Sequence, residues 1–217
     1  MSGESECSKV TIYMIGDSTM ADKSPDQEFE RGWGQMLPLF VKEEAVVSNH
    51  ARNGRSSKSF LDEGLWEPVY NSMKPGDWLI IQFGHNDQKP DEKRHTEPFT
   101  TYMDHLRFYV EQARSKGAVP IICTSIVRGW FKDGALQDSH GDYIQAAVQA
   151  AEELDVPLLD LEKRTRELVS ELGEARLTVY YVPYDTTHLS PWGATRTAQM
   201  ACEEIKKLNL PLAEYLG

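Results

Sequence analysis

Four segments of the chain contain side chains that could together hydrolyse an ester. In the segment IGDSTM, Ser18 follows an apolar run and a glycine, so a turn there would expose its hydroxyl. A serine hydroxyl becomes a nucleophile only when a base takes its proton, and histidine suits that task near neutral pH. His188 is the candidate base, because Asp185 precedes it in the segment DTTH and could bind one ring nitrogen while the other stays free. Each segment alone has a simpler interpretation, as a helix cap or a solvated turn.

Acyl transfer also needs hydrogen-bond donors for the negative charge that develops on the carbonyl oxygen. The backbone N–H of Ser18 is one candidate donor. Gly54 could bring a second N–H close, because glycine permits tight approach of the backbone, and the side-chain amide of Asn86 is a third candidate. Taken singly, Gly54 is typical of a turn and Asn86 of a cap. All three follow predicted strands, however, so we expect them to meet at one edge of a sheet.

The elements that must position these residues alternate along the chain. Strands are predicted for the short apolar runs at 11–15, 45–48, 77–83, 118–124 and 156–160. Helical apolar spacing recurs at 101–113, 142–154 and 198–208. Short, nearly continuous apolar strands are typical of a parallel sheet covered on both faces, which predicts an α/β sandwich whose functional loops follow the strands. Ser190 and Pro191 predict the cap and first residue of the last helix, which would hold the DTTH segment in place.

The bulk composition narrows the classes of function. The chain has 217 residues, of which 40% are hydrophobic, and this predicts a single domain over residues 1–217 with a sizeable core. A net charge of −11 argues against nucleic acid as a partner, because a phosphate backbone would be repelled. No apolar run reaches the length of about 18 residues that a membrane-spanning helix needs, so we expect no membrane partner.

The cysteines and the first residues indicate a compartment. Cys7, Cys123 and Cys202 are odd in number and widely spaced, which is typical of a reducing cytoplasm and not of a disulfide framework or a zinc cluster. Apolar surroundings place Cys123 and Cys202 in the predicted core. The segment MSGESECSKV has neither the basic region nor the apolar region of a secretory signal. The sequence therefore predicts a cytoplasmic protein without a bound metal.

Taken together, four blocks resemble those of the SGNH hydrolases, also called GDSL esterases. They are Gly16-Asp17-Ser18, Gly54, Gly84-His85-Asn86-Asp87 and Asp185-Thr186-Thr187-His188, in family order. The GxSxG turn of the α/β-hydrolases is absent. The resemblance implies a three-layer α/β/α sandwich with a five-stranded parallel sheet, the flavodoxin-like SGNH hydrolase fold, and no cofactor. It also implies that Ser18 is the nucleophile, His188 the general base and acid, and Asp185 its orienting partner, with an oxyanion hole formed by Ser18, Gly54 and Asn86.

Softer features resemble the rhamnogalacturonan acetylesterase branch of that family. They are GDST, the GWG segment at 32–34, NGRSS at 53–57, GHND and the THLS segment at 187–190. The resemblance implies a substrate with acetyl groups on pectin-derived sugars, here an acetylated oligosaccharide. In the stretch 52–58, which has basic residues and no acid, Arg55 is the candidate partner of a galacturonate carboxylate, with a solvated basic loop as the alternative. Trp130, in the long segment 128–141, is the candidate wall for a sugar ring.

Three other functions are compatible with the same residues. The machinery could act on a different ester, such as a lipid, a thioester or a sialyl acetate. The fold could also bind carbohydrate without hydrolysing it. A metal-dependent hydrolase could use Asp185, His188 and His85 as ligands, although no second cluster of ligands is visible. Asp17 is expected to brace its loop rather than react, and the oligomeric state and the role of segment 128–141 stay open.

Overall fold

The computed structural model describes residues 9–217, so Cys7 and most of the segment used for the leader prediction lie outside the described residues. A parallel sheet forms its centre. The strands are β1 (Val10–Gly16), β2 (Ala45–Asn49), β3 (Trp78–Gln82), β4 (Val119–Cys123) and β7 (Leu158–Leu159). Their order is β2-β1-β3-β4-β7, and every neighbouring pair is parallel. This is the order of flavodoxin-like sheets, and it confirms the predicted five-stranded parallel sheet.

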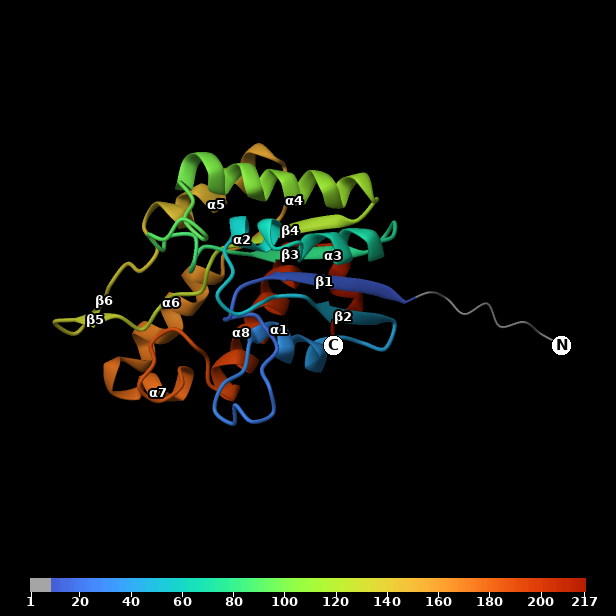
Figure 1. The fold of residues 1–217 in the computed structure, drawn as a ribbon. Coiled ribbons are helices and arrows are strands. Elements are labelled where there is room, and N and C mark those ends of the chain that lie inside the picture. The colour runs from blue at the N-terminus through green and yellow to red at the C-terminus, as the bar shows by residue number, and fades with distance from the viewer. Residues whose placement is uncertain (1–8) are drawn as a thin grey trace.

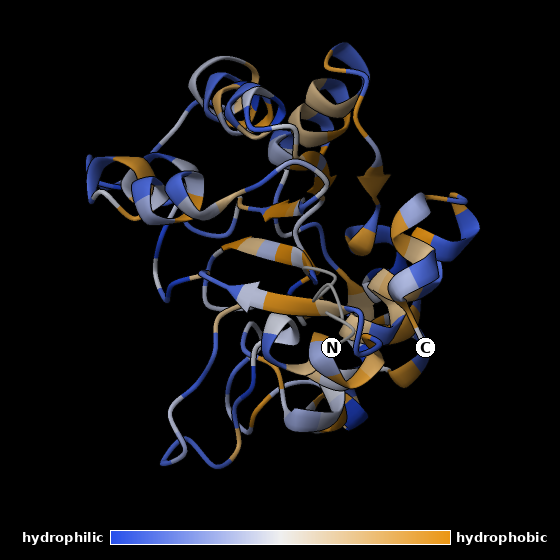
Figure 2. Cartoon of the chain, turned by 90° about the vertical axis from the view of Figure 1, so that its right-hand side faces the viewer, coloured by the Kyte–Doolittle hydropathy of each residue, from blue (hydrophilic) through white to orange (hydrophobic). Residues whose placement is uncertain are grey.

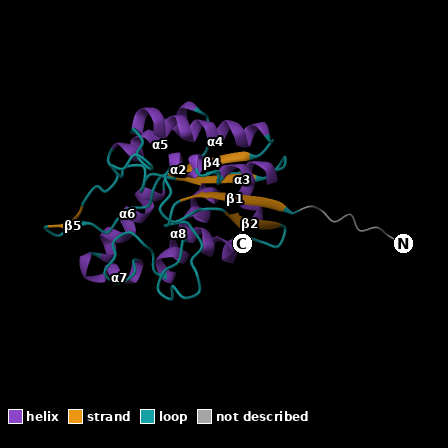
Figure 3. Ribbon diagram, in the orientation of Figure 1, coloured by secondary structure: helices purple, strands orange, loops and turns teal. Residues whose placement is uncertain are grey.

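Helices cover both faces of this sheet (Figures 1 and 3). On one face lie α1 (Trp33–Met36), α6 (Leu161–Leu172), α7 (Leu177–Tyr180) and α8 (Pro191–Lys207). On the other lie α2 (Ser57–Asp62), α3 (Trp66–Ser72), α4 (Met103–Ser115) and α5 (Asp142–Glu153). Short helical turns complete the chain: η1 (Leu37–Phe40), η2 (Pro98–Tyr102), η3 (Glu174–Arg176) and η4 (Pro211–Tyr215). The predicted three-layer α/β/α sandwich is thus confirmed.

The core consists of two apolar layers that the sheet separates. Successive residues of β3 alternate between them: Leu79 and Ile81 pack toward α3, α4 and α5, and Ile80 packs toward α1 and α8. Figure 2 shows the result as apolar strands at the centre with the polar faces of the helices turned outward. A strand that is buried on both faces must be apolar throughout, which is why these strands read as continuous apolar runs.

The predicted elements differ from the observed ones mainly at their ends. β7 lies at the edge of the sheet and pairs with β4 only through Leu158 and Leu159, so the run predicted at 156–160 is too long. The helices predicted at 101–113 and 142–154 correspond to α4 and α5. The apolar face predicted to reach Leu208 ends earlier, since Leu208 follows α8 and is 42% exposed.

The carboxyl ends of the strands all point toward one end of the molecule. From that end also projects the segment predicted as a long polar loop, which contains a small hairpin of β5 (Phe131–Lys132) and β6 (Ala135–Leu136) (Figure 1). Loops that follow β1, β2 and β3 therefore come together beside the segment that precedes α8. This convergence is what the strand–loop order of the sequence predicted.

Candidate active site

Ser18 lies at the tip of the turn that ends β1. The backbone C=O of Asp17 accepts hydrogen bonds from the N–H groups of Met20 and Ala21, which closes the turn. Asp17 and Thr19 are fully buried on either side, whereas Ser18 is partly exposed. The turn therefore buries its two polar neighbours and leaves the serine hydroxyl accessible.

The GWG segment at 32–34 holds this turn in place through hydrogen bonds. Trp33 and Gly34 donate their backbone N–H groups to the carbonyls of Thr19 and Met20, at 2.9 and 3.1 Å. The indole of Trp33 donates to the side chain of Gln82, at 2.7 Å, and Gln82 in turn donates to the hydroxyl of Thr19, at 2.8 Å. The start of α1 thus fixes both the backbone and the buried side chains of the serine turn.

His188 and Asp185 meet Ser18 in one hydrogen-bonded array. Nε2 of His188 lies 2.9 Å from the Ser18 Oγ, and Nδ1 lies 2.6 Å from Oδ2 of Asp185. The other carboxylate oxygen accepts the backbone N–H groups of Thr187 and His188, at 2.6 and 3.0 Å. Partial burial acts to raise the pKa of Asp185, but these hydrogen bonds, first that of the His188 ring, outweigh it, so the pKa lies below its usual range. Asp185 is therefore a carboxylate that holds the ring with Nε2 toward the serine.

The segment that carries this pair is fixed at the start of α8. Ser190 caps the helix: its hydroxyl accepts the N–H of Gly193, at 3.0 Å, and donates to the carbonyl of Val179, at 2.7 Å. Pro191 occupies the first turn, and Tyr181 forms a β-bridge with Leu189. The predicted cap and proline are confirmed, and they hold the end of the DTTH segment against the core.

The two other predicted oxyanion donors lie on neighbouring loops. Gly54 has a φ of +76°, and nothing lies within 4 Å of the place where a Cβ would stand, so its backbone borders open space. Asn86 is buried, and its amide donates to the backbone carbonyl of Arg55, at 3.1 Å. This bond ties Asn86 to the Gly54 loop, and the second hydrogen of the amide remains for another acceptor.

A buried lysine that the sequence reading missed supports the Gly54 loop. The side chain of Lys23 is fully buried, and its Nζ donates to Oδ1 of Asn53, at 2.6 Å, and pairs with Glu30, at 2.7 Å. Asn53 directly precedes Gly54. The loop after β1 is therefore joined to the loop after β2 by a hydrogen-bonded charge, which a lysine thirty residues away in sequence gave no reason to expect.

The sequence reading also missed a buried pair beside the serine. Oδ2 of Asp17 lies 3.1 Å from Nδ1 of His85, while Oδ1 accepts both the N–H and the hydroxyl of Thr19. Burial acts to raise the pKa of Asp17, but His85 and Thr19 outweigh it, and the pKa lies below its usual range. Burial lowers the pKa of His85 despite the carboxylate, so the pair is an aspartate with a neutral imidazole. Asp17 braces its turn, as expected from the sequence.

The last residue of the GHND block is a second buried carboxyl. Asp87 is fully buried and accepts hydrogen bonds from the N–H and hydroxyl of Ser57 and from the hydroxyl of Thr96. Burial raises its pKa to about 7, although the bonds from Ser57 and Thr96 act in the opposite direction. Asp87 therefore joins the start of α2 to the loop after β3 and titrates near neutral pH.

The two predicted substrate contacts have different surroundings. The guanidinium of Arg55 is already paired with Glu63, at 2.6 Å, in a partly exposed ion pair. The predicted site wall Trp130 is 45% exposed, and its indole N–H donates to the hydroxyl of Thr186, at 3.0 Å, inside the DTTH segment. Trp33 and Trp66 offer no ring to a sugar, because both are buried in the core. Trp130 thus stands next to the triad, whereas Arg55 is occupied by an acid.

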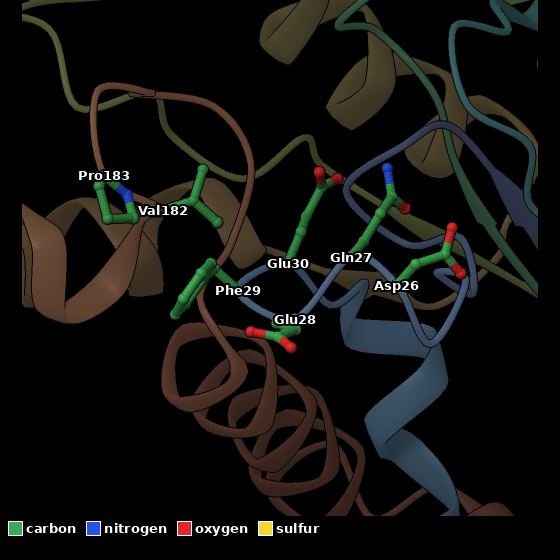
Figure 4. A pocket seen from close by; sticks show the side chains of 7 residues that line it. All are labelled: Asp26, Gln27, Glu28, Phe29, Glu30, Val182 and Pro183. Carbon is green, nitrogen blue, oxygen red and sulfur yellow. The ribbon is translucent and has the colours of Figure 1, made fainter.

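Two hollows lie beside loops of the site, and neither is lined by Ser18, Asp185 or His188. One, of about 480 Å³, lies between residues 26–30 and the pair Val182 and Pro183, which lead into the DTTH segment (Figure 4). The exposed ring of Phe29 lines it beside these two residues, with the carboxylates of its neighbours around it. The other, of about 360 Å³, follows the loops after β1 and β2 and is lined by Asp22, Arg52 and Arg55, among others. The second hollow therefore lies beside the loop that contains Gly54, because Asn53 and Arg55 line it.

Two further features concern metals and membranes. Among residues 9–217, no group of three or more His, Cys, Asp and Glu side chains is arranged to hold a metal ion. His85, considered as a ligand, instead contacts Asp17. None of the helices in the described part of the chain is both long and apolar enough to cross a membrane.

A parallel α/β sheet that carries a Ser–His–Asp array on the loops at its carboxyl edge defines the class of serine-dependent acyl hydrolases. The family model of the GDSL-like Lipase/Acylhydrolase family matches residues 14–196. The chain belongs to this family. The rhamnogalacturonan acetylesterase RhgT of Bacillus subtilis is similar to it, with 37% identity over 95% of this chain and 94% of the relative. The rhamnogalacturonan acetylesterase of Emericella nidulans is 29% identical over 95% of this chain and 89% of the relative.

Solved structures show the same fold. The crystal structure of protein YxiM from Bacillus subtilis matches with a TM-score of 0.85 and 29% identity, over 94% of this chain and 58% of that chain. The acetylxylan esterase Axe2 of Geobacillus stearothermophilus matches with a TM-score of 0.70 and 22% identity, over 91% of this chain and 94% of that chain. The three-layer sandwich is therefore the fold of this family.

Proposed function

We propose that the protein is a serine esterase that removes O-acetyl groups from pectin-derived oligosaccharides. The observation that carries the proposal is the array in which the Ser18 hydroxyl lies 2.9 Å from the His188 ring and the other ring nitrogen lies 2.6 Å from Asp185. These are the distances of a nucleophile in contact with its base and of a base in contact with its orienting carboxylate. Family membership supports the same class of reaction.

The reaction proceeds through an acyl-enzyme. Oγ of Ser18 attacks the acetyl carbonyl while Nε2 of His188 takes its proton, and Asp185 stabilises the imidazolium. The oxyanion receives hydrogen bonds from the backbone N–H groups of Ser18 and Gly54 and from the amide of Asn86. Collapse breaks the ester bond, and the proton on His188 passes to the leaving sugar hydroxyl. A water activated by the same ring then attacks the acetyl-serine, which releases acetate and restores the free serine.

The relatives named as rhamnogalacturonan acetylesterases support an acetylated pectic substrate. Trp130 supplies an exposed aromatic face beside the DTTH segment, on which a sugar ring can stack. For a galacturonate carboxylate we now favour Arg52 over Arg55. Both arginines line the hollow of about 360 Å³ beside the loops after β1 and β2. The guanidinium of Arg52 has no side-chain partner within residues 9–217, whereas Arg55 is paired with Glu63. The buried free thiols of Cys123 and Cys202 are in keeping with a cytoplasmic enzyme acting on imported oligosaccharides.

Replacing the nucleophile tests the reaction class. Ser18→Ala should lower kcat for acetate release by about 10⁴-fold or more, because the remaining donors bind the ester without forming an acyl-enzyme. The variant should keep the circular dichroism and unfolding midpoint of the parent, since the hydroxyl is partly exposed. Measurable acetyl turnover by the folded variant would refute Ser18 as the nucleophile.

A substrate panel separates acetylated pectic sugars from other esters. Acetate release should be fastest from acetylated galacturonate oligosaccharides and slower from acetylated xylo-oligosaccharides or esters with longer acyl chains. Arg52→Ala should raise KM for the galacturonate substrate only, with Lys58→Ala, a neighbouring cation already paired with Asp62, as the matched control. Equal rates on all esters would instead favour a general esterase. Binding without turnover and without labelling of Ser18 by a fluorophosphonate would favour a carbohydrate-binding protein.

A further inference from the structure

Three consecutive residues that follow β4 hold the segment between Asp185 and His188. Nε of Arg128 donates to the hydroxyl of Thr187, at 3.2 Å. The backbone N–H of Gly129 donates to the carbonyl of Thr186, at 2.8 Å, and the indole N–H of Trp130 donates to the hydroxyl of the same threonine, at 3.0 Å. Both threonines of DTTH are thus bound by this stretch, which accounts for two polar side chains that the triad itself does not use.

Arg128 is built into this place. It is 4% exposed, and its other nitrogens donate to the carbonyls of His85, at 3.1 Å, and Ser139, at 3.3 Å. Its guanidinium also lies over the ring of Trp130, 5.2 Å from the centroid. Within residues 9–217 no carboxylate stands at ion-pair distance from it, so hydrogen bonds to neutral groups must compensate the cost of burying the charge. A buried cation that serves only as packing would be replaced at lower cost by an apolar side chain.

Tyr181 fixes the backbone on either side of Arg128. A Cβ on Gly129 would stand 2.8 Å from the ring of Tyr181, so only glycine lets the segment lie this close. The hydroxyl of Tyr181 donates to the carbonyl of Val127, at 2.7 Å, and the same tyrosine forms the β-bridge with Leu189, the residue after His188. The three residues and the end of the DTTH segment therefore share one rigid support.

We propose that Arg128, Gly129 and Trp130 form a clamp that positions the catalytic pair Asp185 and His188 by holding Thr186 and Thr187. The proposal rests on the proposed function, because it concerns the same array. Arg128 and Gly129 contact neither substrate nor reacting atoms, and Trp130 takes part through its indole N–H, whereas its exposed ring face is the proposed sugar platform. The clamp acts by keeping the His188 ring at contact distance from the Ser18 hydroxyl. Since small displacements of a base from its nucleophile slow proton transfer strongly, loosening the clamp should lower the reactivity of Ser18.

The reactivity of Ser18 toward a fluorophosphonate measures this positioning without knowledge of the natural substrate. Thr187→Val removes the acceptor for Arg128 but keeps the shape, and Thr187→Ser keeps the acceptor. Thr187→Val and Arg128→Lys should each lower the second-order rate of inactivation about tenfold, whereas Thr187→Ser should stay within about twofold of the parent. Arg166→Lys is the matched control. Arg166 donates to the carbonyl of Gln137, which lies toward the other end of segment 128–141 from Arg128.

A second measurement separates positioning from general stability. The proton on Nδ1 of His188, which faces Asp185, should give a far-downfield proton resonance that shifts or disappears in Thr187→Val and stays in place in Arg166→Lys. With an acetyl ester, the same substitution should lower kcat and leave KM nearly unchanged. Folded Thr187→Val that reacts at the parental rate would overturn the clamp, and this variant decides the matter even if Arg128→Lys fails to fold. A parent protein that does not react with the fluorophosphonate would refute the proposed function itself.

Discussion

Asp17, Ser18 and Thr19 are neighbours in sequence with different environments. The two outer residues are buried and hydrogen-bonded to one another, while the serine between them faces His188. In this turn the side chains of Asp17 and Thr19 point into the core and that of Ser18 points out of it. A polar segment can therefore follow an apolar strand, because its buried side chains bind each other. The buried Asp17–His85 pair beside it adds a second aspartate and histidine that contact each other but not the serine hydroxyl. Two Asp–His pairs therefore lie near Ser18, and only the pair of Asp185 and His188 contacts its hydroxyl.

Asp87 offers a test of electrostatics at the level of one residue. Burial raises the pKa of its carboxyl to about 7 in the folded protein, above the value near 3.8 that an unfolded chain would have. The folded state therefore binds the proton more tightly than the unfolded chain. The resulting contribution to stability is complete below the unfolded-state pKa and is lost as pH rises through the folded-state pKa. Asp87→Asn cannot titrate. Between pH 5 and pH 8, the free energy of unfolding of the parent should fall relative to this variant by about 2.5 kcal/mol.

Urea unfolding of both proteins at the two pH values measures this difference. Asp133→Asn, which removes an exposed carboxylate from the turn between β5 and β6, controls for the loss of one negative charge. A difference between parent and Asp87→Asn that does not change with pH would show that Asp87 does not carry its proton near neutrality.

At the level of elements, the residues of the site lie on loops, and neighbouring elements fix the positions of those loops. β1 ends in the serine turn, β3 leads to Asn86, and α8 begins just after His188. Parallel strands bring their carboxyl ends to one edge, but the last segment has no such strand before it. Its position depends on the helix cap at Ser190 and on the residues after β4 that contact its threonines.

Ser190→Ala tests the contribution of the cap. The change removes the acceptor for Gly193 N–H and the donor to Val179, so the free energy of unfolding should fall by about 1 kcal/mol. Because Ser190 lies only two residues after His188, kcat should fall as well. Ser115→Ala, which removes an exposed hydroxyl at the end of α4, is the control. Equal effects of the two substitutions on unfolding and on kcat would show that the cap does not support the site.

On the scale of the whole molecule, the sheet divides the apolar core into two layers. The layer toward α1 and α8 contains Trp33 and Trp78, and the layer toward α3, α4 and α5 contains Trp66. Every central strand contributes to both layers, so neither can form without the sheet. We therefore propose that residues 1–217 constitute one domain that unfolds as a unit.

Two neighbouring residues of β3 test this unity. Leu79 and Ile80 are both fully buried but face different layers. Leu79→Ala and Ile80→Ala should each lower the free energy of unfolding by about 2–5 kcal/mol through lost burial and a residual cavity. In both variants tryptophan fluorescence and far-ultraviolet circular dichroism should follow a single shared transition. Separate transitions, or a shift seen by one probe only, would divide the molecule into two units.

Features that depend on nearby residues or on regular spacing could be predicted from the amino-acid sequence. Apolar runs predicted the strands, helical spacing predicted α4, α5 and α8, and Ser190 with Pro191 predicted the start of the last helix. The four polar blocks predicted which loops would carry the site. Such features can be predicted because secondary structure periodicity and capping act within a few residues of the chain.

The folded structure, in contrast, was needed to show which distant side chains are partners. Asp17 meets His85 across 68 residues of sequence, and Arg128 meets Thr187 across 59. It also assigned Arg55 to Glu63 and left Trp130 exposed while Trp66 is buried. The reason is that burial and hydrogen-bond partners depend on how loops from different strands pack in space, and no spacing within one segment encodes the position of another segment.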